Sequence, residues 1–380
     1  MKIVIAPDSF KESMTAMEAA TAIEEGFKTI IPDAEYIKVP MADGGEGTVQ
    51  SIVDATKGKI KNLQVTGPLG DKIDAHYGLS GDKTLAFIEM AASSGLDKVE
   101  PARRNPLITT TLGFGELIRD ALDEGVSHIL LGIGGSATND GGAGMIMSLG
   151  GKLLDGDKQA ISPNGKGLED LVYIDLSDVH PRVKEVSFRV ACDVDNPLTG
   201  KRGAARIYGP QKGATKEQVE RLDENLSRFA RIIKESTGKD VESVPGAGAA
   251  GGLGAGIMAF LDGQLERGGD LLVDILDLTQ KMKGSDLVVT GEGGINHQTV
   301  YGKTPVAVSR VAHAQGIPVI ALAGCLGEGY EAVYEHGIHA AFSILPEFMS
   351  VEAALDNGYK NLKQTAQNCA RLIALSGVKE

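Results

Sequence analysis

Short apolar runs alternate with longer amphipathic stretches toward both ends of the chain. Residues 3–6, 287–290 and 319–324 are rich in valine, isoleucine, leucine and alanine; the first run is followed by Pro7, the second by Gly291, and the third ends at Gly324. Runs of this length predict buried strands of a parallel sheet. The stretches 15–31 and 351–375 carry apolar residues at helical spacing, and a Thr15-x-x-Glu18 capping box opens the first of them. Strands alternating with helices predict an α/β fold.

The pattern changes in the middle of the chain. Shorter, hairpin-like runs at 64–66, 73–77 and 85–89 follow residue 62, and a Gly-Pro-Leu-Gly turn separates the first two. We therefore expect a doubly wound parallel sheet formed by residues 1–62 and 286–380. A second α/β domain, residues 63–285, is expected to interrupt it.

A glycine-rich loop follows the apolar run at 128–132. It reads Gly-Ile-Gly-Gly-Ser-Ala-Thr-Asn-Asp-Gly-Gly-Ala-Gly over residues 132–144, and the apolar run Met145–Met147 comes next. This order is typical of strand, loop and helix. Glycine lets a backbone approach a ligand closely, and the free N–H groups of a helix start attract anions. The loop predicts a phosphate site; the alternative is a tight turn that needs glycine for geometry alone.

Polar side chains also follow other predicted strands. Asp8, Ser9 and Lys11 come directly after residues 3–6, at a strand end where ligands of open α/β sheets bind. Asp43 and Glu46 lie among glycines in a later loop, where carboxylates suit Mg²⁺. Local turn hydrogen bonds are the alternative for Asp8 and Ser9, and a favourable helix dipole is the alternative for Glu46.

Two further loops carry candidate groups. Asp193 and Asp195 follow the run 188–192 and point the same way if that strand continues, which suits a metal ion or a general base. An Asx-Pro turn at 196–197 is the alternative. Arg104 is a candidate clamp for a carboxylate or phosphate, although an exposed arginine is the commoner outcome.

Composition and charge narrow the class of protein. The formal net charge is −13, without a Lys/Arg-rich run, which argues against nucleic-acid and anionic-membrane partners. The 50 glycines among 380 residues exceed the usual share of about 7% and indicate many ligand-facing loops. Three cysteines without metal-like spacing, and a start that passes directly into a strand, predict a cytoplasmic protein. The sequence has no G-x-S-x-G elbow and no complete P-loop, whereas residues 132–137 loosely fit a dinucleotide fingerprint.

Taken in order, these loops resemble the bacterial glycerate kinase family, type 1. The segments that carry the resemblance are 6–11, 42–47, 132–142, 191–193, 196–198, 209–213, 245–252 and 290–293. The resemblance implies ATP-dependent phosphorylation of D-glycerate with Mg²⁺, at the 2-hydroxyl, with the 3-hydroxyl as the alternative. It also implies a flavodoxin-like domain built from both termini and an inserted α/β domain, with the site in the cleft between them. The expected partners are D-glycerate and ATP, with a homodimer considered as the assembly.

Residue roles follow from phosphoryl-transfer chemistry, which needs positioning and charge neutralisation. We expect the 134–136 backbone and nearby side chains to cradle ATP phosphates, Lys11 to neutralise the transferred group, and Asp193 to hold Mg²⁺ or accept the substrate proton. The candidates for catalysis are Lys11, Asp193 and Asp43; for substrate, Asp8, Ser9, Arg104, Asn296 and Gln298; for ATP, Gly134, Gly135, Ser136, Thr138 and Asn139; for Mg²⁺, Asp43, Asp193 and Glu292.

One position departs from the family pattern. After glycine, glutamate and glycine, the family usually has arginine, an aliphatic residue and aspartate, where this chain has Gly294, Ile295 and Asn296. An amide keeps the shape of a carboxylate without its charge, so it is neither a base nor a strong metal ligand. Asn296 therefore leaves a catalytically impaired binding protein open as an alternative. Two further alternatives are a kinase of another small hydroxy or sugar acid and, from the fingerprint match at 132–137, a nicotinamide dehydrogenase.

Overall fold

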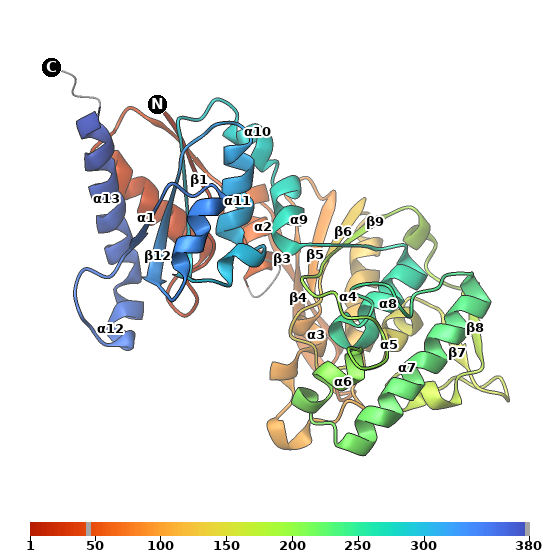
Figure 1. The fold of residues 1–380 in the computed structure, drawn as a ribbon. Coiled ribbons are helices and arrows are strands. Elements are labelled where there is room, and N and C mark those ends of the chain that lie inside the picture. Colours follow the sequence, from red (N-terminus) through yellow and green to blue (C-terminus); the bar gives the residue numbers. More distant parts are fainter. Residues whose placement is uncertain (43–46, 377–380) are drawn as a thin grey trace. The chain divides into compact units, whose positions relative to one another are not determined.

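The computed structural model describes residues 1–42 and 47–376 (Figure 1). The chain divides into two compact units: a terminal unit, Met1–Lys57 with Arg267–Glu380, and an inserted unit, Gly58–Glu266. From the sequence, the domain boundaries were predicted at 62/63 and 285/286. Strand β3 (Lys59–Thr66) pairs along its length with β4 (Lys72–Leu79), which brings it into the inserted unit. Helices α9 (Gly268–Ile275) and α10 (Leu278–Met282) pack on α11 (Thr304–His313) in the terminal unit.

The terminal unit contains a five-stranded sheet in which every neighbouring pair is parallel. The strand order is β13-β12-β11-β1-β2, which is 2-1-3-4-5 when the strands are counted within this unit. This is the flavodoxin-like order, so the predicted fold class is confirmed. Ligands of such sheets bind beyond the strand ends where the order reverses, here between β1 and β11. The strands are β1 (Lys2–Ile5), β2 (Glu35–Lys38), β11 (Leu287–Ile295), β12 (Val319–Leu326) and β13 (Ala340–Ser343).

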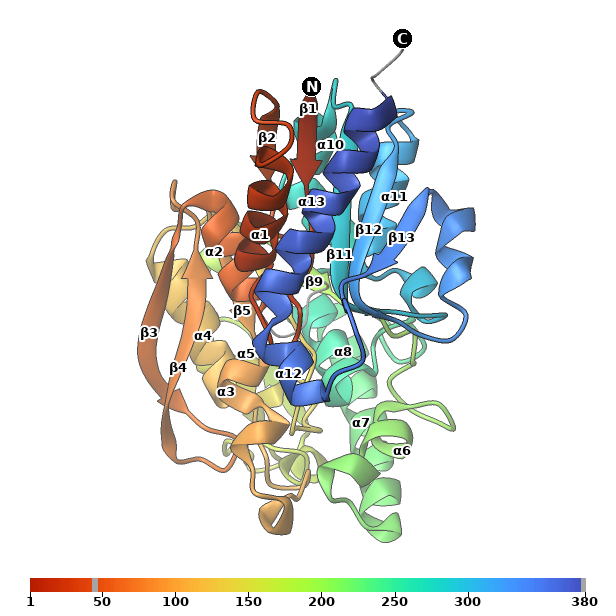
Figure 2. The same cartoon turned by 90° about the vertical axis from the view of Figure 1, so that its left-hand side faces the viewer.

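Helices cover both faces of this sheet. Helices α1 (Ala16–Lys28) and α13 (Gly358–Ser376) pack side by side on one face, and α11 covers the other (Figures 1 and 2). The predicted capping box is confirmed: the Thr15 hydroxyl accepts the Glu18 N–H at 3.2 Å, and the Glu18 carboxylate accepts the Thr15 N–H at 2.8 Å. Helix α2 (Thr48–Thr56) follows the residues 43–46 that lie outside the described part of the chain.

The single C-terminal helix expected over 351–375 is two helices. Helix α12 (Val351–Asp356) ends at Asn357, whose side chain donates to the Ala353 carbonyl at 2.8 Å, and α13 begins at Gly358. A Cβ added at Gly358 would lie 2.1 Å from the Ser13 hydroxyl. The break therefore lets the chain pass closely over the loop that follows β1.

The inserted unit is built on a six-stranded mixed sheet in the order β10-β9-β6-β5-β4-β3. The pairs β3/β4 and β4/β5 are antiparallel, which confirms the predicted hairpin-like strands, and the other pairs are parallel. Its remaining strands are β5 (Leu85–Glu89), β6 (His128–Gly132), β9 (Ser187–Ala191) and β10 (Gln264–Glu266), with a separate pair β7 (Lys152–Leu154) and β8 (Tyr173–Asp175). Its helices are α3 (Ala91–Ser94), α4 (Leu112–Asp123), α5 (Ala143–Ser148), α6 (Ala204–Tyr208), α7 (Lys216–Thr237) and α8 (Ala249–Leu261).

The core of the inserted unit lies against the β6 strand and under the loop that follows it. Phe229 of α7 and Leu253 of α8 are fully buried in this core. The glycine-rich segment that starts α8 contacts the same loop: a Cβ added at Gly251, where φ is +71°, would lie 2.0 Å from the Thr138 carbonyl oxygen. Within the described residues, no helix has both the length and the apolar character that a membrane span requires.

Candidate functional site

The loop after β6 presents three consecutive backbone N–H groups. Gly134 and Gly135 are exposed, and within the described residues no acceptor pairs with the N–H of Gly134, Gly135 or Ser136. The loop is nevertheless held firmly, because the Gly135 carbonyl accepts the Leu96 N–H at 2.8 Å and the Ala137 N–H donates to Ser94 at 2.9 Å. Gly135 has φ +72°, a conformation that favours glycine. Successive open N–H groups around such a turn form an anion-binding concavity.

A buried lysine supports this loop from within the inserted unit. Lys212 ends the 3₁₀ turn Pro210–Lys212, and its ammonium donates to the Ser136 hydroxyl at 2.6 Å and to the Thr138 carbonyl at 2.7 Å. Burial lowers the pKa of Lys212 to about 7, although the nearby Asp140 carboxylate opposes this shift. An ammonium has three N–H donors, so one remains for a further acceptor. Lys212 therefore brings a positive charge directly to the loop with the open N–H groups.

The turn that carries Lys212 is packed closely on the segment around Arg104. Gly213 has φ +92°, and a Cβ at this position would lie 2.4 Å from the Arg104 carbonyl oxygen. The Arg104 guanidinium donates to the carbonyls of Val99 at 3.3 Å and Leu96 at 3.4 Å. Arg104 thus holds residues 96–99 in place, and the Leu96 N–H of this segment donates to the Gly135 carbonyl. Its expected role as a carboxylate clamp stays a prediction.

A side chain of the protein, Asp140, caps the N-terminus of helix α5. The buried Asp140 carboxylate accepts the Thr111 N–H at 2.9 Å, the Thr111 hydroxyl at 2.8 Å, and the N–H groups of Gly142 and Gly144 at 3.1 and 3.3 Å. Burial nevertheless raises the pKa of Asp140. We had expected a helix start to supply the phosphate-binding groups, but this start is capped by the protein itself. The open N–H groups lie instead in the turn at 134–136.

Buried polar atoms without partners lie next to the same loop. Thr138 and Asn139 are fully buried, and the Thr138 hydroxyl and both amide atoms of Asn139 make no hydrogen bond within the described chain. Leaving a buried polar group unpaired costs about 1–3 kcal/mol. Such groups in a folded protein indicate a strained or functional site, or one completed by water or ligand.

In the terminal unit, Asp8 joins the end of β1 to the start of α11. Its carboxylate accepts the Ser9 N–H at 2.6 Å and the Ser9 hydroxyl at 3.3 Å, and its other oxygen accepts the Thr304 hydroxyl at 2.6 Å. Only 9% of Asp8 is exposed. The local turn hydrogen bond considered from the sequence is therefore present, together with a link to a distant helix.

Glu292 lies on the neighbouring strand β11. Its side chain is buried, accepts the Thr299 hydroxyl at 3.0 Å, and lies 3.7 Å from the Lys303 ammonium. The Asp8 N–H donates to the Gly291 carbonyl at 2.8 Å, so Asp8 and Glu292 lie at adjoining strand ends. Lys11 is exposed, and its backbone lies near β11: a Cβ added at Gly293 would be 3.6 Å from the Lys11 backbone nitrogen. These residues gather at the sheet edge where ligands of this fold bind.

The described carboxylates form no dedicated metal cage. Within residues 1–42 and 47–376, no three histidine, cysteine, aspartate or glutamate side chains are grouped closely enough to hold a metal ion. Asp43, a predicted ligand, lies outside the described residues. In nucleotide sites Mg²⁺ is bound by one or two carboxylates, by phosphates and by water. The buried, hydrogen-bonded Glu292 carboxylate fits that limited requirement.

Asn296 and Gln298 form part of a local turn. The Asn296 side-chain oxygen accepts the Gln298 N–H at 2.8 Å, and the Asn296 N–H donates to the Thr299 hydroxyl at 3.2 Å. Gln298 is exposed. Because Thr299 also bonds to Glu292, the turn and the carboxylate are held together. An aspartate at position 296 could accept the same N–H group, so this contact does not depend on the amide.

The expected alignment of Asp193 and Asp195 is not found. Strand β9 ends at Ala191, so the alternation that would align the two side chains does not continue. Asp195 pairs with Arg202, and the Asn196 side chain donates to the Arg202 carbonyl at 2.8 Å and accepts the Tyr208 hydroxyl at 2.7 Å. Asp193 is exposed at the start of this loop.

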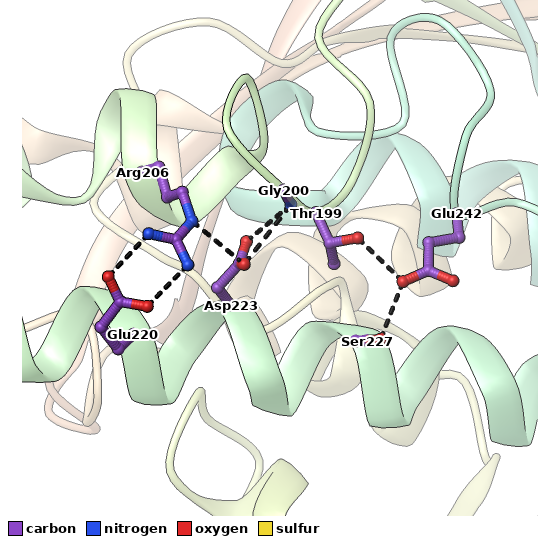
Figure 3. A network of polar contacts seen from close by, with 7 residues as sticks. All are labelled: Thr199, Gly200, Arg206, Glu220, Asp223, Ser227 and Glu242. Carbon is purple, nitrogen blue, oxygen red and sulfur yellow. Dashed lines mark hydrogen bonds and ion pairs between the residues drawn. The ribbon is translucent and has the colours of Figure 1, made fainter.

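A network on α7 fixes the far end of that loop (Figure 3). Asp223 accepts the Gly200 N–H at 3.0 Å and the Arg206 guanidinium at 3.2 Å, and Arg206 also forms a two-armed contact of 2.6 Å with Glu220. Burial raises the pKa of Asp223, although Arg206 and the Gly200 N–H oppose this shift. Beside it, Glu242 accepts the hydroxyls of Thr199 and Ser227, both at 2.8 Å.

Comparison with known proteins identifies the family. The model of the "Glycerate kinase family" matches residues 3–374. This chain belongs to the glycerate kinase family. It is 58% identical over 368 residues to a "Glycerate kinase" of Halalkalibacterium halodurans, with 97% of both chains covered. It is 50% identical over 375 residues to the "Glycerate 2-kinase" of Escherichia coli, with 99% of this chain and 98% of the relative covered.

A solved structure agrees with this assignment. A crystal structure from Salmonella typhimurium LT2, assigned to glycerate kinase 2, is 51% identical in sequence; the alignment covers 100% of both chains with a TM-score of 0.93. The α/β fold class is thereby confirmed. The chain is a kinase, and the family resemblance of its ordered loops is confirmed across nearly its full length.

Sequence reasoning had not selected Lys212, Asp140 or Thr304. Lys212 stands in a short basic segment between a proline and a glycine, within one of the segments that resemble glycerate kinases. That signal marked the segment and not the residue. Its partner Ser136 is 76 positions away, and Thr304 is 296 positions from Asp8, so these contacts needed the folded chain.

Proposed function

We propose that this glycerate kinase transfers the γ-phosphoryl group of ATP to the 2-hydroxyl of D-glycerate, giving 2-phosphoglycerate, ADP and a proton. The observation that carries the proposal is the loop with three open N–H groups at 134–136, together with the Lys212 ammonium at Ser136. The name of the Escherichia coli relative, "Glycerate 2-kinase", supports the 2-position.

The inserted unit supplies the nucleotide phosphate site in this proposal. The N–H groups of Gly134, Gly135 and Ser136 donate to phosphate oxygens, and the Lys212 ammonium adds a charge-assisted contact. The unpaired side-chain atoms of Thr138 and Asn139 stand next to this turn and complete it when nucleotide or its bound water is present. Groups fixed before the reaction stabilise developing charge without reorganisation.

The terminal unit supplies groups for the acceptor. Asp8 and Ser9 are held at the end of β1 by Thr304, and the exposed Lys11 follows them. Lys11 neutralises charge on the group in transfer, while Asp8, Ser9, Asn296 and Gln298 orient D-glycerate. From the inserted unit, Arg104 is proposed to bind the carboxylate of D-glycerate, when its guanidinium gives up a backbone carbonyl for the substrate.

The proton of the 2-hydroxyl goes to Asp193 in this proposal, because it is an exposed carboxylate at a strand end. Mg²⁺, when bound, neutralises phosphate charge. Glu292, Asp193 and Asp43 are the residues that would hold it. Thr299 keeps the Glu292 carboxylate in place for this purpose.

The proposal is tested by ADP release from ATP and Mg²⁺ with and without D-glycerate, followed by ³¹P NMR of the product. Glycerate-dependent ADP release with the 2-phosphate signal is the expected result. A panel of other small hydroxy acids serves as the control for substrate choice. Faster turnover of another acid would contradict the assignment of D-glycerate as the substrate. A 3-phosphate signal would contradict transfer to the 2-hydroxyl.

A further inference from the structure

A cavity separate from the residues proposed for the kinase reaction lies within the terminal unit, between helix α11 and the segment Tyr334–His339. Its volume is about 480 Å³, which is in the range of small-molecule sites. None of the residues assigned above to glycerate, ATP or Mg²⁺ lines it. Its charged and titratable lining residues are Arg267, Arg310, His313, Tyr334, Glu335, His336 and His339.

Arginine and histidine side chains are concentrated in this lining of an otherwise acidic chain, and their positive charge exceeds that of Glu335 and of Asp270, which pairs with Arg310, when the histidines are protonated. The chain has a formal net charge of −13 and seven histidines, yet two arginines and three of those histidines meet here with one carboxylate, Glu335. Asp270 pairs with Arg310 from outside the lining and orients its guanidinium. A local concentration of guanidinium and imidazole groups in a concave site is the recognition chemistry of phosphate and carboxylate.

The histidines are held in defined positions. The His339 Nδ1 accepts the Val319 N–H at 3.1 Å, which leaves Nε2 as the ring nitrogen that can donate to a ligand. The His336 carbonyl accepts the Ser309 hydroxyl of α11 at 2.7 Å. Gly337 has φ +90°, and a Cβ there would approach the His313 Cβ to 3.2 Å, so the turn is packed on that imidazole.

Helix α11 connects this cavity to the acceptor side of the kinase site. Gly302, Val306, Arg310 and His313 line the cavity along the helix and just before it. The same helix begins at Thr304, whose hydroxyl bonds to Asp8, and Lys303 precedes it beside Glu292. A ligand that favours one position of α11 therefore acts on residues at the substrate site.

We propose that this cavity, the α11 pocket, is a second anion site that binds a small phosphate monoester of an organic acid and thereby changes the turnover of the kinase. The class of ligand follows from the mixed arginine and histidine lining and from the small volume. Binding to the pocket does not depend on the proposed substrate. The effect on turnover does rest on the proposed function.

Histidine NMR of the full chain tests the binding. The protein is labelled at histidine, each signal is assigned with single His→Gln variants, and inorganic phosphate and then 3-phosphoglycerate are added at constant ionic strength. Saturable shifts are expected at His313, His336 and His339, with none at His76 or His128 of the inserted unit. Chloride alone should not reproduce them.

Two variants and a matched control make the test specific. Arg267→Gln and Arg310→Gln should each weaken binding at these histidines at least about five-fold, as expected for a lost charge-assisted contact. Arg371→Gln on α13, outside the pocket, should leave it unchanged. Unsaturable shifts, or equal binding by Arg310→Gln and wild type, would overturn the site.

Turnover separates this inference from the proposed function. Adding phosphate should alter glycerate-dependent ADP release in wild type and Arg371→Gln, and less in Arg310→Gln. Histidine shifts without any such change would overturn the coupling through α11. Histidine shifts in a protein that releases no ADP with D-glycerate would overturn the proposed function and leave the binding site standing.

Discussion

The side-chain ammonium of Lys212 lies 2.6 Å from the hydroxyl of Ser136, the last of three residues whose N–H groups are open. The contact places a buried positive charge behind an anion-binding turn. Burying a charge is costly unless it is paired, and here the nearby Asp140 carboxylate only partly offsets the effect of burial on the pKa of Lys212. Because a pKa of about 7 leaves Lys212 only partly protonated at neutral pH, an anion bound at the proposed phosphate site would favour its charged form.

Replacing Lys212 with methionine should remove that charge and preserve most of the side-chain volume. We expect kcat/KM for ATP to fall by about 10²–10³, the loss typical of one preorganised charge-stabilising group. Stability should change by no more than about 2 kcal/mol, because removing a buried charge offsets the loss of the contacts with Ser136 and Thr138. Steady-state kinetics and thermal unfolding measure both. Lys216→Met, at an exposed lysine in the same unit, is the control; equal activity of the two variants would remove Lys212 from the site.

The lowered pKa of Lys212 also predicts how stability depends on pH. Its pKa is about 7 in the folded protein, whereas an unfolded lysine has a pKa of about 10.4, so the unfolded chain binds more protons between these values. The free energy of unfolding should therefore rise with pH between about 7 and 10, by roughly 3–4 kcal/mol from this group. Urea unfolding of wild type and Lys212→Met measures the difference. Parallel pH profiles of the two proteins would contradict a lowered pKa.

Asp140→Asn should destabilise the loop that carries the open N–H groups. An amide oxygen can replace one carboxylate oxygen, but the NH₂ group then faces either the N–H donor of Gly142 or those of Thr111 and Gly144. We expect a loss of about 2–4 kcal/mol in the free energy of unfolding. Chemical denaturation with Asp157→Asn, an exposed aspartate of the same unit, as control measures it. A loss no larger than in the control would show that Asp140 does not hold the loop.

Asn296→Asp should keep its turn, because either side chain can accept the Gln298 N–H. We therefore expect kcat within roughly five-fold of wild type. Asn296→Ala removes the acceptor and should raise KM for D-glycerate more than it lowers kcat. A hundred-fold gain in the aspartate variant would show instead that the wild-type site lacks a needed carboxylate.

The sequence predicted the strands and their loops well, because strand runs and capping residues are local signals. Thr15 and Glu18 cap α1 as expected, and the strand order of the terminal unit is flavodoxin-like. The local pattern does not distinguish a glycine that approaches a ligand from one that approaches another backbone. Gly251 is of the second kind, since a Cβ there would lie 2.0 Å from the Thr138 carbonyl oxygen.

Contacts between distant segments account for what sequence reasoning missed. Asp140 appeared to be part of a phosphate loop, but it caps α5 because Thr111 is folded beside it. The sequence left open whether the strand continues to Asp195; β9 ends at Ala191, and Arg202 and the α7 network hold the loop that follows it. The roles given to Lys11, Asp193 and Arg104 stay predictions.

Hydrogen exchange of the 132–140 segment tests most directly whether this loop binds nucleotide phosphate. Exchange is measured by mass spectrometry with no ligand, with ADP or ATP and Mg²⁺, and with D-glycerate alone. We predict that nucleotide slows exchange at Gly134, Gly135 and Ser136, whose N–H groups are open in the structure, and that D-glycerate alone does not. Unchanged exchange with saturating nucleotide, or protection by D-glycerate alone, would contradict the assignment of the phosphate site.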